Sequence, residues 1–184
     1  MTVELDFAWV EGGTCLFGDA ARPVGVRGLW WSATCITHAQ ADAEGVGDEP
    51  VTSVSLAEAD AMAAEMGGRL PTSVEWEWMA AGLERRRYPW GDQDWEPLLA
   101  NLTGSPVGRP LPVGSLPDGA TPDGLLDVAG NVWEWTASTV MGGGAVLRGG
   151  SYNSHPLYAR CRFLNAAPAW LRSPGIGVRV VREP

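Results

Sequence analysis

Apolar residues recur with helical spacing in the segment SLAEADAMAAEMGG, residues 55–68. One face of the expected helix would carry Leu56, Ala59, Met62, Ala63 and Met66. Ser55 and Glu58 have the spacing of a capping box, which satisfies free backbone N–H groups at a helix start. Gly67 and Gly68 follow the last apolar position and are typical of a helix end. The pattern predicts a first short helix.

A second helical pattern follows in TSVEWEWMAAG, residues 72–82. Thr72 and Glu75 repeat the capping-box spacing. A common face would carry Val74, Trp78 and Ala81. The pattern predicts a second short helix directly after the first.

The rest of the chain alternates short apolar runs with turn residues. Residues 7–36, with FAWVEGGTCLFGD and VRGLWWSATCI, read as strands of a meander. Residues 37–50 are acidic and glycine-rich and indicate an exposed loop, and residues 88–124 are rich in proline and indicate a long ordered loop. The last third returns to short strands in NVWEWTAS, AVLRGGSY and GIGVRVVRE. We expect one α+β domain over residues 1–184.

Composition refines this picture. The 24 glycines and 14 prolines predict short elements, and the 10 tryptophans predict an aromatic-filled core, with Trp76, Trp78, Trp133 and Trp135 as core residues. The net charge of −9 argues against nucleic-acid binding, which needs a basic face. No apolar run approaches the ~20 residues that span a membrane. The acidic start has no signal-peptide pattern, so we expect a cytoplasmic protein, and arginine without lysine suggests a GC-rich bacterial genome.

The three cysteines, Cys15, Cys35 and Cys161, are widely separated. Their spacing matches neither a zinc site nor a disulfide framework. We expect buried, reduced thiols.

Five segments, in order, resemble the formylglycine-generating enzyme (sulfatase-modifying factor) family. They are VEGGTCLFGD, PVTSVSLAEADAMAAEMGGRLPTSVEWEWMAAG, YPWGD, GLLDVAGNVWEWT, and RGGSY with GIGVRVV. The resemblance implies a C-type-lectin-like fold with little regular secondary structure, two helices and twisted antiparallel sheets. The family includes copper oxidases, non-heme iron sulfoxide synthases, pyoverdine-maturation proteins, and noncatalytic binding proteins such as the variable proteins of diversity-generating retroelements. Fold therefore does not decide function.

The segment RGGSYNSHPLYARCRF, residues 148–163, is where the resemblance implies the catalytic copper site. The two copper-binding cysteines of the family correspond here to Ser154 and Ala159. Since Cu(I) is held by soft thiolates, this difference argues against copper. The iron branch uses three histidines, largely from an N-terminal helical domain, whereas this sequence has only His38 and His155, which argues against iron.

A structural calcium ion has better support from the resemblance. Its ligands would be the side chains of Asp127 and Glu134 and the carbonyls of Gly130 and Val132 in DVAGNVWE. Hard oxygen donors of this kind suit Ca²⁺. In the alternative interpretation Glu134 pairs with an arginine and Asp127 caps a turn.

Two hypotheses for function stay open. In the first, residues 152–174 bind a protein, peptide or glycan, and the chain is a binding module, in its sharpest form a retroelement variable protein. The binding residues would be Tyr152, Asn153, Ser154, His155, Leu157, Tyr158, Arg162, Phe163, Trp170 and Arg172. Trp170 would form an exposed aromatic patch with Tyr152, Tyr158, Phe163 and His155.

In the second hypothesis the chain is a metal-dependent oxidoreductase of the same superfamily with altered ligands. Its cleft would be lined by Ser151, His155, Tyr158 and Cys161. A further possibility is an interaction domain whose catalysis resides on another chain.

Overall fold

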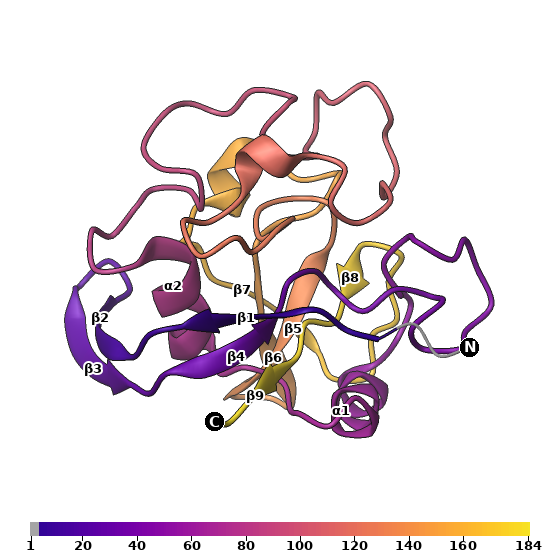
Figure 1. Cartoon of the computed structure of the whole chain (residues 1–184), viewed down its shortest axis with the longest axis horizontal. Helices are drawn as coiled ribbons and strands as arrows, with labels where there is room; N and C mark the ends of the chain where they lie inside the picture. Colours follow the sequence, from indigo (N-terminus) through magenta and orange to yellow (C-terminus); the bar gives the residue numbers. More distant parts are fainter. Residues whose placement is uncertain (1–3) are drawn as a thin grey trace.

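The computed structural model describes residues 4–184, and both predicted helices are present in it (Figure 1). Helix α1 spans Leu56–Glu65 and helix α2 spans Ser73–Ala81. Both capping boxes are confirmed: the Glu58 carboxylate accepts from the Ser55 amide at 2.8 Å. The Glu75 carboxylate accepts from the Thr72 amide at 2.7 Å.

The buried face of α1 is the predicted one, with Ala59 and Ala63 fully buried. The face of α2 differs from the prediction. Trp76 is fully buried, whereas Trp78 is half-buried and donates from Nε1 to the Glu11 carbonyl at 2.8 Å. The reason is that α2 lies against two sheets, with β2 on one side and β5 and β6 on another, so more than one face is covered.

Four short strands occupy residues 7–32, but the predicted meander pairing is wrong. They are β1 (Phe7–Val10), β2 (Gly13–Phe17), β3 (Arg22–Val26) and β4 (Leu29–Ser32). Strand β1 pairs with β4, and β4 pairs with β9 (Val181–Arg182), while β2 and β3 form a separate hairpin. The hairpin leaves the sheet where Gly12 and Gly28 meet: a Cβ on Gly12 would lie 2.6 Å from the Gly28 nitrogen.

The C-terminal third forms a mixed four-stranded sheet in the order β7-β6-β5-β8. Its strands are β5 (Trp133–Val140), β6 (Gly144–Arg148), β7 (Asn165–Pro168) and β8 (Ile176–Gly177), and β8 runs parallel to β5. Strand β7 was not anticipated from the sequence. Two 3-10 turns, η1 (Pro117–Gly119) and η2 (Pro156–Ala159), lie in the loops. Long loops from residues 88–124 cover one end of the molecule, at the top of Figure 1.

Two ion pairs are buried between these layers. Arg148 on β6 binds Glu77 on α2 at 2.6 Å, and Arg179 binds Glu134 on β5 at 2.9 Å. All three cysteines are free and buried, as predicted. Trp76 and Trp135 are fully buried and Trp133 is 9% exposed, so their predicted core role is confirmed.

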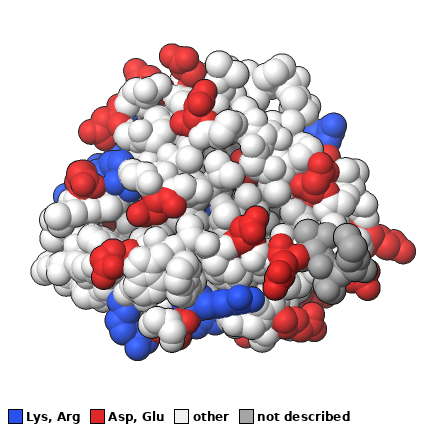
Figure 2. Space-filling model, in the orientation of Figure 1, with Lys and Arg blue, Asp and Glu red and all other residues white. Residues whose placement is uncertain are grey.

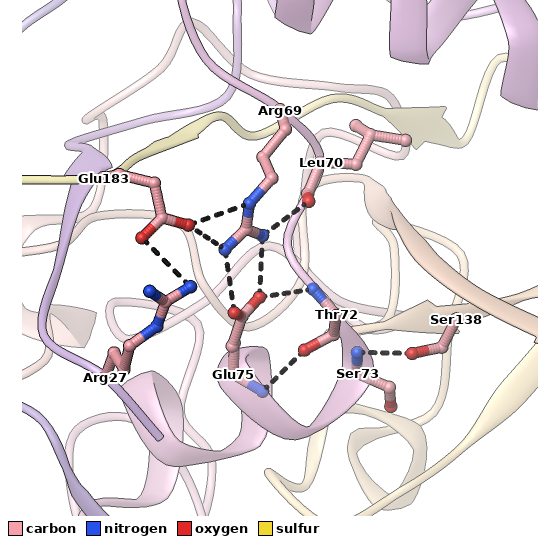
Figure 3. Close-up of polar contacts among 8 residues, drawn as sticks. All are labelled: Arg27, Arg69, Leu70, Thr72, Ser73, Glu75, Ser138 and Glu183. Carbon is pink, nitrogen blue, oxygen red and sulfur yellow. Dashed lines mark hydrogen bonds and ion pairs between the residues drawn. The ribbon is translucent and has the colours of Figure 1, made fainter. Parts of the chain in front are cut away.

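The surface carries most of the charge. Figure 2 shows acidic side chains dispersed over the face in view, with fewer basic ones, as the net charge requires. One polar network ties the C-terminal segment to α2: Arg69 binds Glu75 and Glu183, each at 2.9 Å (Figure 3). Within residues 4–184, neither helix has the length and apolarity needed to cross a membrane.

Candidate functional site

A glycine turn directs the chain from β6 into the candidate site. Gly149 and Gly150 both have positive φ angles, 93° and 79°, which side chains disfavour. A Cβ on Gly149 would lie 2.6 Å from the Val128 carbonyl oxygen. The turn therefore requires glycine, and it places residues 151–164 across the end of the mixed sheet.

Two adjoining cavities open over this segment, and both contain Trp133, Asn153 and Asn165 in their walls. The first has a volume of about 350 Å³ and is completed by Ser154, Tyr158 and Phe163. The second has a volume of about 370 Å³ and extends past Ser151 and Tyr152 to residues 171–176. Because they share three residues, we treat them as one feature, the C-terminal groove.

One wall of the C-terminal groove is aromatic. The ring of Phe163 packs edge-on against Tyr158 at 4.9 Å between centroids and lies 6.5 Å from Trp133. Tyr158 is 41% exposed, so its ring is available to a ligand. Asn153 and Asn165 are exposed and add amide donors and acceptors. The groove thus combines a ring surface with polar groups that have no charge.

The two positions that hold copper ligands in the family have structural roles here. Ser154 is buried, accepts a hydrogen bond from the Ser151 amide at 3.0 Å and lies 3.2 Å from the Ser151 hydroxyl. Ala159 is fully buried. A hydroxyl that fixes the turn and a methyl group supply no thiolate.

The four residues suggested for an enzymatic cleft are not brought together. Ser151 and Tyr158 line the C-terminal groove at different ends. His155 is exposed and outside its walls, and its Nδ1 accepts from the Leu157 amide at 3.2 Å, which caps η2. Cys161 is fully buried, and burial raises the pKa of its thiol to about 12. The thiol therefore stays protonated and inaccessible.

Five of the ten suggested binding residues lie outside the groove: His155, Leu157, Arg162, Trp170 and Arg172. Trp170 is 74% exposed but follows the far end of β7, where Ala169 bonds to Gly143 and to Leu56 of α1. The expected patch of Trp170 with the tyrosines therefore needs correction: the groove's aromatic wall is formed by Trp133, Phe163 and Tyr158.

The side chains of Arg172 and Arg162 contact carboxylates outside the groove. Arg172 makes two hydrogen bonds to the Glu58 carboxylate, at 2.8 and 2.9 Å. Arg162 lies beside Leu157 in a separate small cavity, 3.9 Å from Asp19.

The proposed calcium ligands fit that ion only in part. Asp127 accepts one hydrogen bond, from the Gly114 amide at 2.6 Å, and burial raises the pKa of its carboxyl group. Both oxygens of Glu134 already have donors, from Trp76 at 2.6 Å and from Arg179 at 2.9 Å. Within residues 4–184 no group of three or more His, Cys, Asp or Glu side chains is arranged to hold a metal ion.

Sequence reasoning missed Trp133 and Asn165 as parts of the groove. The sequence predicts Trp133 as a core residue, and at 9% exposure it also lines both cavities of the groove. Asn165 was overlooked because β7 itself was not anticipated. A polar residue within the run FLNAAP is the one signal that pointed to it.

A family profile matches nearly the whole chain, and curated proteins resemble about three quarters of it. The profile of the sulfatase-modifying factor enzyme 1-like domain matches residues 7–184. Hercynine oxygenase of Mycobacterium tuberculosis is 41% identical over 156 residues, which cover 72% of this chain and 36% of that protein. The formylglycine-generating enzyme of the same species is 34% identical over 154 residues, which cover 73% and 51%.

Among solved structures, Treponema denticola variable protein 1 superposes with a TM-score of 0.81 over 99% of this chain and 96% of that chain, at 18% identity. This likeness concerns the fold alone, and it confirms the C-type-lectin-like architecture expected from the sequence. The chain spans about a third to a half of the length of the curated relatives it matches.

Proposed function

The chain belongs to the sulfatase-modifying factor enzyme 1-like family, and from this premise we propose that it is a binding member of that family. Its C-terminal groove would receive a segment of a partner protein. The observation that carries the proposal is the groove itself: an aromatic wall and two exposed amides lie beside Ser154, one of the two positions that correspond to the copper-binding cysteines of the family.

The chemistry of the groove favours an extended peptide over a metal centre. Rings of Trp133, Phe163 and Tyr158 supply apolar contact, and aromatic side chains carry much of the binding energy in protein interfaces. Asn153 and Asn165 match the donors and acceptors of a peptide backbone.

Strand addition at the sheet edge is less favourable than side-chain recognition in the groove. Strand β7 is one edge strand of the mixed sheet, and the two-residue β8 is the other; in β7 the Ala166 amide donates to the Asn165 side chain at 2.9 Å, and Pro168 has no N–H. A partner segment would therefore lie across the groove rather than extend the sheet.

Panning a random-peptide display library on the full chain tests this proposal. Enriched peptides should bind the Asn153→Arg variant at least about tenfold more weakly, because a long charged side chain would fill the groove. Trp30→Ala, on the distant exposed face of β4, is the matched control and should bind as the wild type does. Peptides that bind both variants equally would contradict the proposal.

A sharper form of the proposal is that the chain is a variable protein of a diversity-generating retroelement. This form concerns the gene. It requires a second, nearly identical copy of the coding segment for residues 148–179 nearby, differing at adenines. Sequencing the neighbourhood tests it. Absence of such a copy removes this form and leaves the binding proposal in place.

An oxidase function is the second candidate, and the similarity to hercynine oxygenase favours it. This chain covers 36% of that protein, and the three-histidine iron site that the resemblance implies would need a histidine beyond His38 and His155. Metal analysis of the purified chain separates the two functions. Stoichiometric copper or iron that is lost in His155→Ala would establish the oxidase alternative and overturn the binding-only proposal.

We also propose calcium as a structural ion at Asp127, supported by its half-buried side chain, whose carboxylate accepts a single hydrogen bond. Glu134 would have to share its carboxylate between the ion and Arg179. Calcium chelation should then lower the melting temperature of the wild type and leave that of Asp127→Asn unchanged. Equal melting temperatures of the wild type with calcium and with chelator would contradict the proposal.

A further inference from the structure

Arginine side chains converge on a small cavity beside the C-terminal groove. The cavity has a volume of about 120 Å³ and shares Phe163 with the groove. Its walls are formed by Asp19, Arg87, Leu157, Arg160, Arg162 and Phe163. Three of the 13 arginines of a chain with net charge −9 thus meet at one place. We call it the arginine cavity.

The backbone holds these arginines in position. Cys161 is fully buried, and its amide donates to the Arg87 carbonyl at 2.9 Å. This bond fastens the segment after α2 to the segment 160–162. On either side of the buried thiol, Arg160 is exposed and Arg162 is half-buried, so both side chains leave the core and reach the cavity.

The positive charge of the arginine cavity is only partly neutralised. Arg160 makes no side-chain hydrogen bond or ion pair with any residue in 4–184. The contact of Arg162 with Asp19 is long, 3.9 Å, and the Asp19 side chain is 95% exposed, so this pair is weak. Arg87 binds Asp94 at 2.8 Å, but its Nε is buried without a hydrogen-bond partner in the described chain.

We propose that the arginine cavity is a carboxylate subsite for the partner segment that lies in the groove. Guanidinium groups bind carboxylates through paired, charge-assisted hydrogen bonds. The volume of about 120 Å³ is large enough for a carboxylate group. Because Phe163 borders both cavities, a peptide in the groove reaches the subsite with an acidic side chain or its C-terminal carboxylate. This inference rests on the proposed function.

An acetate titration of the arginine-labelled full chain tests the subsite without a peptide. The titration is followed by NMR at constant ionic strength, with chloride as the comparison salt. Acetate should shift the Arg87 Nε–H resonance, and the shift should saturate as the acetate concentration rises. Arg160→Gln/Arg162→Gln should weaken acetate binding on the order of tenfold. Asp19→Asn, which removes a competing carboxylate, should strengthen it. Arg27→Gln, an exposed arginine paired with Glu183, is the matched control and should have no effect.

Selected peptides then separate the two sources of carboxylate and the two proposals. If amidation of the peptide's C-terminus abolishes binding, the terminal carboxylate occupies the subsite. If a Glu→Gln or Asp→Asn substitution in the peptide abolishes binding, an acidic side chain occupies it. Peptides that need the groove but bind Arg160→Gln/Arg162→Gln unchanged would overturn the subsite and leave the proposed function intact. If acetate binding saturates but the peptides bind the Asn153→Arg variant as well as the wild type, the proposed function is overturned instead. Acetate shifts no different from those of chloride, or tighter binding of inorganic phosphate, would contradict a carboxylate site.

Discussion

At the scale of single residues, the buried ion pair of Arg179 and Glu134 lies at the centre of a network of buried hydrogen bonds. Arg179 donates from Nε to Glu134 at 2.9 Å, and its terminal nitrogens donate to the carbonyls of Ser32, Ala33 and Leu126. Glu134 also accepts from Trp76 at 2.6 Å. Each charge is therefore compensated inside the protein. Removing one partner would leave the other charge buried without a counterion, which destabilises the fold.

Arg179→Met keeps much of the side-chain volume but removes the charge. We expect the free energy of unfolding to fall by about 3–5 kcal/mol, because Glu134 would be buried without its counterion. Urea denaturation measures the change. Arg172→Met, which removes an exposed ion pair with Glu58, is the control and should leave the urea midpoint nearly unchanged. Equal midpoints for Arg179→Met and the wild type would contradict this account.

The buried thiols give a second prediction at this scale. Burial raises the pKa of Cys161 to about 12 and that of Cys15 to about 11, and it raises the pKa of Cys35 as well. Since the thiolate is the reactive form, the native protein should not react with Ellman's reagent near neutral pH. In denaturant all three thiols should react. Rapid reaction of a native thiol that disappears in Cys161→Ser would show that Cys161 is accessible and restore it as a candidate nucleophile.

At the scale of elements, capping boxes determine where both helices begin, and the second is reinforced from outside the helix. Arg69 makes two hydrogen bonds to the Glu75 carboxylate, both 2.9 Å, while the same carboxylate accepts from Thr72 (Figure 3). Arg69 also binds Glu183, so the start of α2 is tied to the C-terminal strand.

Acidification should reveal this connection. Burial alone would raise the pKa of Glu75, but the hydrogen bonds from Arg69 and Thr72 outweigh it, so the pKa lies below the ordinary 4.5. The carboxylate therefore stabilises the fold above that value, and this contribution is lost as the pH falls through the lowered pKa.

Glu75→Gln should lower the free energy of unfolding at neutral pH by about 1–2 kcal/mol. Its stability should also decline less than that of the wild type in acid, which urea denaturation at a series of pH values measures. Parallel declines in the two proteins would refute the role of Glu75.

Local elements were more predictable than their pairing. The helices follow from caps and apolar spacing, which act within a few residues. The pairing of β1 with β4 depends on the meeting of Gly12 and Gly28, and a contact between distant backbone atoms leaves no periodic signal. Strand β7 was missed because NAAP has neither alternation nor β-branched residues, and its pairing with β6 forms it.

At the scale of the whole molecule, the segment 148–163 supplies much of the candidate site, as its sequence indicated: Tyr152, Asn153, Ser154, Tyr158 and Phe163 line the groove, whereas His155 and Cys161 do not. Its histidine caps a turn and its cysteine is buried in the core. The groove also includes Trp133, which comes from β5, and Asn165, which begins β7 just after the segment. Trp170, conspicuous in the sequence, lies at the far end of β7.

The central claim is that the C-terminal groove is the binding surface of this molecule. Backbone amide NMR spectra of the full chain, recorded with and without a selected peptide, test it most directly. The account predicts shifts concentrated in residues 151–165 and 171–176, with the indole of Trp133 among them. Shifts gathered instead around Trp9 and Trp30, or around the cavity between Leu56 and Ala169, would contradict it.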